Sequence, residues 1–141
     1  MNPSKLDELY HYTFSSAIEA GGYGIGYWCE VKDYKIKLRP KSKAEWNNYS
    51  ATIQVTEFGG DESDLRLVWK GAGGPSGRHY IINRAVMSRG MRLVASGKTN
   101  VHRDYAKRFS DALRNPDDAD LDGNDADIAV QAGLFGEVIF G

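Results

Sequence analysis

The sequence is poor in the features that cross-link or anchor a small protein. Its 141 residues include one cysteine, Cys29, so no disulfide can form within the chain. No apolar run approaches the ~18 residues of a membrane span, and the polar start does not resemble a signal peptide. These absences exclude a disulfide scaffold and a membrane protein and fit a reducing compartment. The length is that of one ordinary domain, so we predict a single domain over residues 1–141.

Complete catalytic and metal-binding motifs are also lacking. The glycines at 22–26 precede a predicted strand, whereas a dinucleotide fingerprint needs a helix after its glycines. The aspartates from Asp118 to Asp122 match half of a calcium loop, but its twelfth position is Ala129, which offers no carboxylate. Cys29 and the three histidines lack the spacing of a zinc site. The sequence therefore predicts no cofactor and favours a binding protein over an enzyme.

The formal net charge of −1 conceals two strongly charged blocks. Residues 78–114 hold nine basic and two acidic side chains, whereas residues 115–141 hold seven acidic and no basic ones. Such blocks either steer a charged partner toward the protein or neutralise each other within the fold. Both interpretations stay open at the level of the sequence.

Apolar residues at helical spacing over residues 6–18 predict an amphipathic N-terminal helix. Either Asn2, followed by a proline, or Ser4, followed three residues later by an aspartate, is suited to cap it. Gly21 and Gly22 are expected to end it, because glycine tolerates the left-handed turn that follows many helices.

Alternating apolar and polar residues then predict four antiparallel strands, at residues 27–38, 49–58, 65–70 and 79–82. Within the first, the alternation changes phase at Asp33, which indicates a bulge or bend. A tight glycine-containing connection after the second strand suits a hairpin.

Beyond these strands the periodicity becomes helical. The predicted C-terminal elements are a helix over 84–97 capped by Asn83, a helix capped by Thr99 or Asn100, a short helix capped by Asn124, and an apolar tail at 136–141 that docks as an edge strand or buried segment. The order of elements predicts an α+β fold with an N-terminal helix, an antiparallel sheet of about four strands and two to three C-terminal helices packed on one face.

The residues most suggestive of function combine aromatic rings, guanidinium groups and the glycine-rich stretch 71–77. Glycine-rich loops offer N–H groups to phosphate, arginine binds phosphate bidentately, and aromatic faces stack on bases. The predicted ligand-binding residues are Tyr23, Tyr27, Trp28, Trp46, Trp69, Gly74, Arg78, His79 and Arg84. The alternative is that most of these aromatic side chains belong to the core.

Both ends of the chain resemble a known group of proteins. Residues 17–28 read AIEAGGYGIGYW and resemble the "ALEGGIGYW" segment of small proteins encoded by tailed bacteriophages, although the turn is longer here. Residues 125–141 read DADIAVQAGLFGEVIFG and resemble their closing "DADxxxQxxLFGEVVYG". The resemblance implies a phage or prophage origin and action in the cytoplasm of the bacterial host. It carries over no catalytic residue.

From this resemblance and the lack of catalytic groups we expect a non-enzymatic protein that counters host defence by sequestering a nucleotide-derived immune signal. Two alternatives stay open: an inhibitor covering a protein or nucleic-acid surface of a defence complex, such as a CRISPR effector, and a small nucleotide hydrolase. Double-stranded DNA is the least favoured partner, because the acidic block offsets the basic one and no groove-reading motif is present. The expected partners are thus a nucleotide-derived small molecule or a host defence protein, without a membrane, and homo-oligomerisation stays open.

Overall fold

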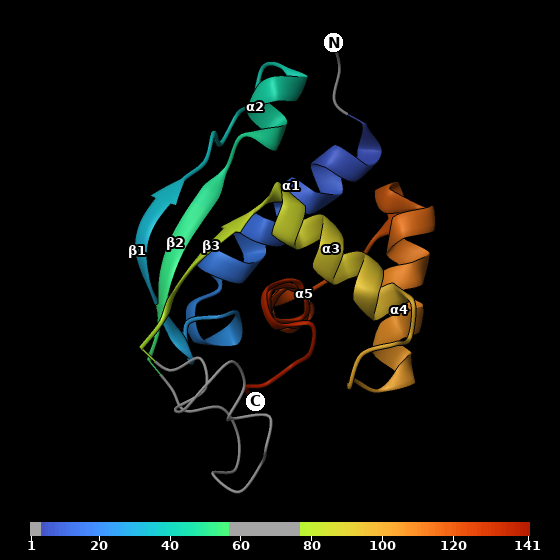
Figure 1. The fold of residues 1–141 in the computed structure, drawn as a ribbon. Coiled ribbons are helices and arrows are strands. Elements are labelled where there is room, and N and C mark those ends of the chain that lie inside the picture. Colours follow the sequence, from blue (N-terminus) through green and yellow to red (C-terminus); the bar gives the residue numbers. More distant parts are fainter. Residues whose placement is uncertain (1–3, 57–76) are drawn as a thin grey trace, which may run out of the picture.

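The computed structural model describes residues 4–56 and 77–141 and has the α+β architecture predicted from the sequence. The elements in chain order are α1 (Lys5–Glu19), η1 (Gly21–Tyr23), β1 (Cys29–Lys35), α2 (Lys43–Asn47), β2 (Ser50–Val55), β3 (His79–Asn83), α3 (Arg84–Ala95), α4 (Arg103–Arg114), η3 (Pro116–Asp118) and α5 (Gly123–Phe135). Figure 1 shows the sheet on one side and the longer helices on the other. No helix in the described ranges is long and apolar enough to cross a membrane.

The sheet of the described residues has three antiparallel strands in the order β1-β2-β3, rather than about four. The predicted strand at 65–70 and the turn before it lie outside the described residues. The register of β1 against β2 shifts between Val31 and Asp33, which confirms the bulge predicted from the change of phase. Because of this bulge, the two predicted half-strands form one continuous strand, which is shorter at both ends than predicted.

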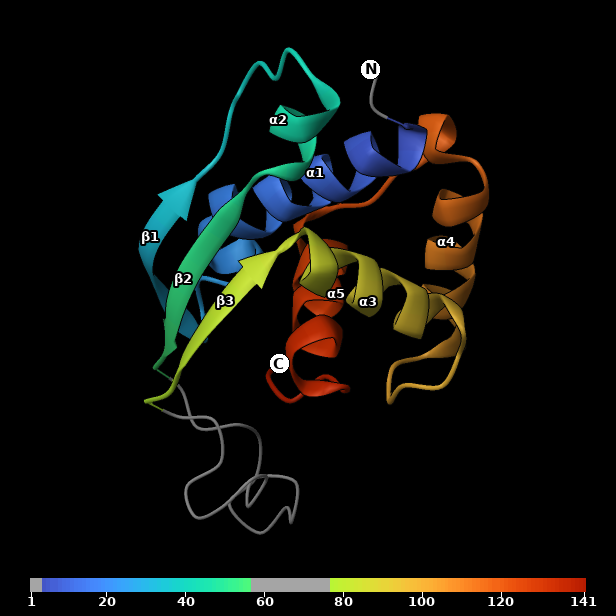
Figure 2. The ribbon, with the colours of Figure 1, turned by 45° about the horizontal axis from the view of Figure 1, so that its top comes forward.

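One face of the sheet is covered by helices, as predicted. Ala51, Ile53 and Val55 of β2 are buried, and they alternate with half-exposed polar residues on the other face. The ring of Phe14 on α1 packs against Tyr49, with ring centroids 4.5 Å apart. In both views α5 lies among α1, α3 and the sheet, whereas α4 lies farther from the sheet (Figures 1 and 2).

The start of α1 confirms one of the two predicted caps. The Ser4 hydroxyl accepts a hydrogen bond from the Asp7 amide at 3.0 Å, and the Asp7 carboxylate accepts one from the Ser4 amide at 2.9 Å. This reciprocal pair satisfies two N–H groups that the first turn would otherwise leave without partners. The alternative cap at Asn2 lies outside the described residues. Past the end of the helix, Gly21 adopts a φ of 58°.

The packing of α3 on α5 depends on two glycines. A Cβ on Gly90 would collide with the backbone carbonyl of Ala129, and one on Gly133 with that of Val86. The helices approach so closely that neither position has room for a side chain. This contact explains why α5 is buried on nearly every side.

The caps of the last two helices differ from those predicted, whereas Asn83 caps α3 as expected by accepting from the Val86 amide at 3.1 Å. His102 caps α4, and Asp122 caps α5 in a capping box with Asp125. Asn100 instead holds the C-terminal tail: its side-chain amide donates to the Val138 carbonyl, and its oxygen accepts from the Val138 amide, both at 2.7 Å.

The tail after α5 is not a strand: residues 137–139 are half-buried, and Phe140 is buried. Phe140 is 4% exposed, and its ring stacks on that of Trp28 at a centroid distance of 4.9 Å and an interplanar angle of 6°. The tail therefore docks on the core through Phe140 and not as an edge strand.

Candidate functional site

The structure does not bring the predicted ligand-binding residues into one site. Arg78 immediately precedes β3 and Arg84 immediately follows it. Because the five residues of β3 lie between them, Arg78 and Arg84 are separated by a rise of about 3.3 Å at each step along the chain from one to the other, or about 20 Å in all. The two guanidinium groups are therefore at opposite ends of the strand and cannot contact a single phosphate. Trp69 and Gly74 lie outside the described residues.

Arg84 has a structural role at its end of the sheet. Its guanidinium donates to the Asp7 carboxylate at 2.9 Å and to the Asn47 side-chain oxygen at 3.1 Å, and it lies over the ring of Tyr10. Burial of Asp7 acts to raise the pKa of that carboxyl, but the hydrogen bonds from Ser4 and Arg84 outweigh it and lower the pKa overall. Arg84 therefore joins the start of α3 to α1 and α2, and two of its five N–H groups make these contacts.

Trp28 is fully buried, so its ring has no face open to a ligand. Its indole N–H donates to Asp127 at 2.7 Å, and Asp127 also accepts from the Tyr27 hydroxyl at 2.6 Å and from Gln131 at 2.9 Å. Burial raises the pKa of the Asp127 carboxyl, against the opposing effect of these three donors. This network joins residues 27–28 to α5, and its role is structural.

Cys29 offers no nucleophile. Its side chain is 5% exposed, and its thiol lies 3.4 Å from the carbonyl oxygen of Ile25. Burial, with a smaller contribution from the nearby Asp127, raises the pKa of the thiol to about 12. At neutral pH the group is therefore protonated and unreactive.

Tyr23 and His79 are both exposed, with Tyr23 at 87%, and no ring contact or hydrogen bond is made by either side chain within the described residues. Arg78 is exposed at the same end of β3 as His79 and lies close enough to Tyr80 to influence its hydroxyl electrostatically. Arg78 and His79 lie where β2 ends and β3 begins, with His79 opposite Gln54, whereas Tyr23 belongs to η1 and its backbone lies beside Gly123 at the start of α5. A ligand role for them remains a prediction.

Trp46 lies in an aromatic cluster at the opposite end of the sheet, beside α1 (Figures 1 and 2). Its ring centroid is 5.6 Å from that of Tyr12 and 4.8 Å from that of His11, both in edge-to-face geometry. Trp46 is half-buried and Tyr12 is 59% exposed, so this pair presents aromatic surface to solvent. Tyr12 was not among the residues predicted from the sequence, although its position off the apolar stripe of the predicted helix is a signal of exposure.

His11 packs against this aromatic surface from the interior of the protein. It is 3% exposed, and its Nε2 donates to the backbone carbonyl of Lys37 at 3.1 Å, which leaves Nδ1 as an acceptor. Nδ1 and the hydroxyl of Tyr49 are buried and have no hydrogen-bond partner among residues 4–56 and 77–141. Burial lowers the pKa of His11, so the ring is neutral at physiological pH. The contact with Lys37 fixes the connection between β1 and α2 against the cluster.

That connection carries a basic strip, which we define as Lys37, Arg39, Lys41 and Lys43. All four side chains are exposed, and none has an ion-pair partner among residues 4–56 and 77–141. The nearest carboxylate in sequence, that of Glu45, accepts from the backbone amide of Lys41 at 2.9 Å. The signal is visible in the sequence, where residues 37–43 hold four cations and no acidic residue, but the net charge of residues 1–77 is close to zero and does not reveal it.

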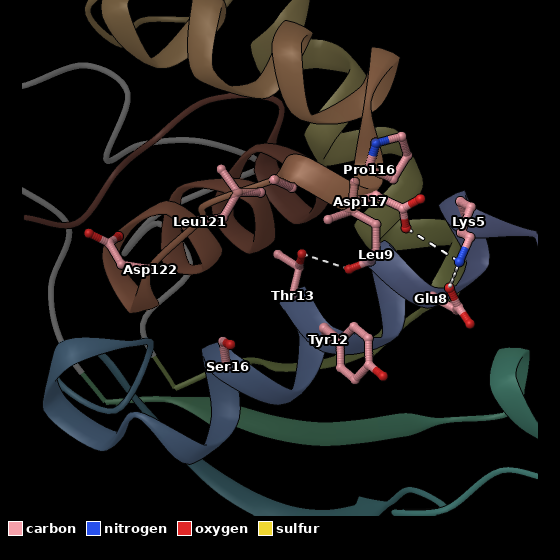
Figure 3. Close-up of a pocket in the computed structure, with 11 residues that line it drawn as sticks. Lys5, Glu8, Leu9, Tyr12, Thr13, Ser16, Pro116, Asp117, Leu121 and Asp122 are labelled. Atoms are coloured by element: carbon pink, nitrogen blue, oxygen red, sulfur yellow. Dashed lines mark hydrogen bonds and ion pairs between the residues drawn. The ribbon is translucent and has the colours of Figure 1, made fainter.

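A groove with a volume of about 270 Å³ lies between α1 and the segment that joins α4 to α5 (Figure 3). One face of α1 contributes Lys5, Glu8, Leu9, Tyr12, Thr13 and Ser16, and the joining segment contributes Pro116, Asp117, Ala119, Leu121 and Asp122. Three carboxylates and one ammonium line it, so the groove repels phosphate. Within the described residues, no group of three or more histidine, cysteine or acidic side chains is placed to hold a metal ion.

The acidic segment pairs with the basic block at one point. Arg108 forms an ion pair with Asp125, the buried residue of the α5 capping box, and also donates to the Asp120 carbonyl at 3.1 Å. Asp117 instead pairs with Lys5 of the N-terminal helix at 3.3 Å. Contact between the two blocks is thus shown at Arg108, and Asp117 is neutralised by a lysine from outside the basic block.

Comparison with known proteins adds no assignment. No protein family, no curated protein and no solved structure matches the chain. The functional argument therefore depends on the chemistry of the surface itself.

Proposed function

We propose that the chain is a non-enzymatic binding protein that sequesters a nucleotide-derived signal, in keeping with the phage resemblance and a role against host defence. The observation that carries the proposal is the basic strip beside the exposed Trp46–Tyr12 pair. Cations without internal partners and open aromatic faces are the two features that bind phosphates and stack on bases.

The location of the strip beside the aromatic pair supports a shared ligand. His11 contacts both the Lys37 carbonyl and the ring of Trp46, and Lys43 belongs to the same short helix as Trp46. A base stacked on this pair would therefore have cationic side chains close by for its phosphates. The surface offers one pair of rings, which suits one or two bases better than a long strand.

This proposal moves the expected site from Arg78 and the glycine-rich stretch to Trp46. Of the residues predicted from the sequence, Trp46 is the one whose half-buried ring lies beside cations that form no ion pair within the described ranges. The predicted ligand role of Arg78 stays a separate hypothesis, which the experiment below tests, and residues 71–76 lie outside the described residues.

The test is calorimetric titration of the full chain with cyclic dinucleotides and ADP-ribose derivatives. Replacing Arg39, Lys41 and Lys43 together by glutamine is expected to weaken the best ligand by at least about tenfold, because each charge-assisted contact contributes about 1.5–3 kcal/mol when formed and less when exposed. The matched control replaces three exposed cations of the other half of the chain, Lys98, Arg103 and Lys107. An Arg78→Ala variant reports separately on the other end of the sheet.

Sequestration and hydrolysis are distinguished by the fate of the ligand. After denaturation of the complex, chromatography should return the nucleotide intact in amounts equal to those bound. Conversion to a product would support the hydrolase alternative. Absence of nucleotide binding, with stable capture of a purified defence protein, would support surface inhibition instead and overturn the proposal.

A further inference from the structure

The groove in Figure 3 has a chemistry opposite to that of the basic strip, and the proposed nucleotide function does not use it. We propose that this groove binds an aliphatic polyamine, a slim chain with an ammonium group near each end. The inference is independent of the proposed function, because it concerns a different surface and a ligand of opposite charge.

The charges of the groove favour a cation at both ends. Glu8 and Asp117 lie at one end and Asp122 at the other, with Leu121 and Thr13 between them (Figure 3). The hydrogen bond from the Asp125 amide to Asp122 lowers the pKa of that carboxyl, so it is ionised at neutral pH. The carboxylate caps α5 by accepting this bond at 2.8 Å, and it places a negative charge at this end of the groove.

The middle of the groove suits a hydrocarbon chain. Leu9 and Leu121 provide apolar surface, and the Thr13 hydroxyl donates to the Leu9 carbonyl at 2.7 Å, so its remaining lone pairs can only accept. Lysine and arginine stems commonly lie along apolar surface in this way while their charged heads stay hydrated. An alkyl chain with ammonium ends has the same division of character.

The size of the groove suits a small occupant. Its volume of about 270 Å³ is below the range of about 300–1,000 Å³ that is usual for drug-sized ligands. The lining residues of α1 run from Lys5 to Ser16, a rise of about 16 Å at about 1.5 Å per residue. A space of this length and volume fits an extended chain.

Lys5 supplies an independent indication that an ammonium is accepted here. Its Nζ lies 3.3 Å from Asp117 and 3.6 Å from Glu8, and its side chain is 62% exposed. Hydrogen bonding to Asp117 raises the pKa of Lys5. A side chain of the protein thus occupies the position that we assign to one end of the polyamine, and it competes with the ligand for these carboxylates.

The experiment titrates spermidine into the ¹⁵N-labelled full chain at low salt and follows amide chemical shifts. Saturable shifts are expected in the α1 and 117–122 amides that line the groove. Asp117→Asn is expected to weaken binding by about fivefold, which corresponds to about 1 kcal/mol for an exposed ion pair. Lys5→Gln should strengthen binding by a similar factor, a gain that loss of structure would not produce.

Asp33→Asn is the matched control, because Asp33 is an exposed carboxylate on β1 and pairs with a lysine at 3.8 Å. Equal weakening by Asp33→Asn and Asp117→Asn would show general attraction of a polycation and overturn the proposal. Absence of saturation at millimolar spermidine would also overturn it, as would binding of an arginine-rich peptide without spermidine binding. Nucleotide titrations of the same variants should be unchanged, so the failure of either proposal is recognised separately.

Discussion

Gln131 holds the C-terminal tail against the core, and its removal is the sharpest test of the packing described above. The side-chain oxygen accepts from the amides of Ile139 and Phe140, both at 2.8 Å, and the side-chain nitrogen donates to Asp127 at 2.9 Å and to the Phe140 carbonyl at 3.2 Å. Gln131 itself is fully buried. One side chain therefore satisfies four polar groups of the interior.

Gln131→Ala leaves the amides of Ile139 and Phe140 without their acceptor, unless the tail detaches and exposes them to water. Asp127 and the Phe140 carbonyl still accept from the Tyr27 hydroxyl. Each unsatisfied buried group costs about 1–3 kcal/mol, whereas detachment forfeits the burial of Phe140, worth about 1.5–3 kcal/mol. The variant adopts whichever of the two states costs less free energy, so we expect its free energy of unfolding to fall by about 3 kcal/mol. For a domain of this size that lowers the melting temperature by about 6–12 °C, at about 2–4 °C per kcal/mol.

Urea denaturation and amide hydrogen exchange together measure this effect. The Ile139 and Phe140 amides are expected to be protected in the wild type and to exchange rapidly in the variant. Asn124→Ala is the control on the same helix, because the Asn124 side chain makes one exposed hydrogen bond, to Tyr105 at 3.1 Å. A loss below about 1 kcal/mol for Gln131→Ala, or unchanged protection of the tail amides, would refute the reasoning.

Two further changes test the core. Burial raises the pKa of Asp127 above its ordinary 3.8, so the folded state binds the proton more tightly and stability falls as the pH rises from about 4 through the folded pKa. Asp127→Asn removes this pH dependence. In urea denaturation the free energy of unfolding of the variant, relative to that of the wild type, should therefore increase as the pH rises through this range. A difference that does not change with pH would contradict a raised pKa of Asp127. Gly90→Ala should cost about 1–3 kcal/mol because its Cβ meets the α5 backbone, whereas Gly22→Ala, with no atom within 4 Å of its Cβ, should be neutral in thermal unfolding.

Local patterns predicted the elements whose ends are determined by neighbouring residues. The Ser4 cap, the bulge at Asp33 and the Asn83 cap all depend on residues within a few positions, and the structure has each of them. The predicted cap of α4 at Thr99 or Asn100 was wrong, because the Asn100 side chain instead binds the tail at Val138, 38 positions along the chain. A long-range contact of this kind leaves no mark in the local sequence.

The candidate site was less predictable, for two physical reasons. Trp28 and Trp46 carry the same side chain, and only the fold decides that the first is enclosed while the second is half-exposed. The separation of Arg78 from Arg84, in contrast, was available from the sequence, because the predicted strand already lay between them. The ion pair between Arg84 and Asp7, however, joins residues 77 positions apart, and only the fold reveals that Arg84 is used in this contact.

The central claim is that the Trp46–Tyr12 surface and the basic strip receive a nucleotide-derived ligand. Its most direct measurement is intrinsic tryptophan fluorescence of the wild type and of Trp46→Phe, titrated with the cyclic dinucleotide or ADP-ribose derivative that binds best in calorimetry. The account predicts saturable quenching in the wild type and its loss in Trp46→Phe, while the melting temperature changes little because Trp46 is half-exposed. Undiminished quenching in Trp46→Phe would contradict the account.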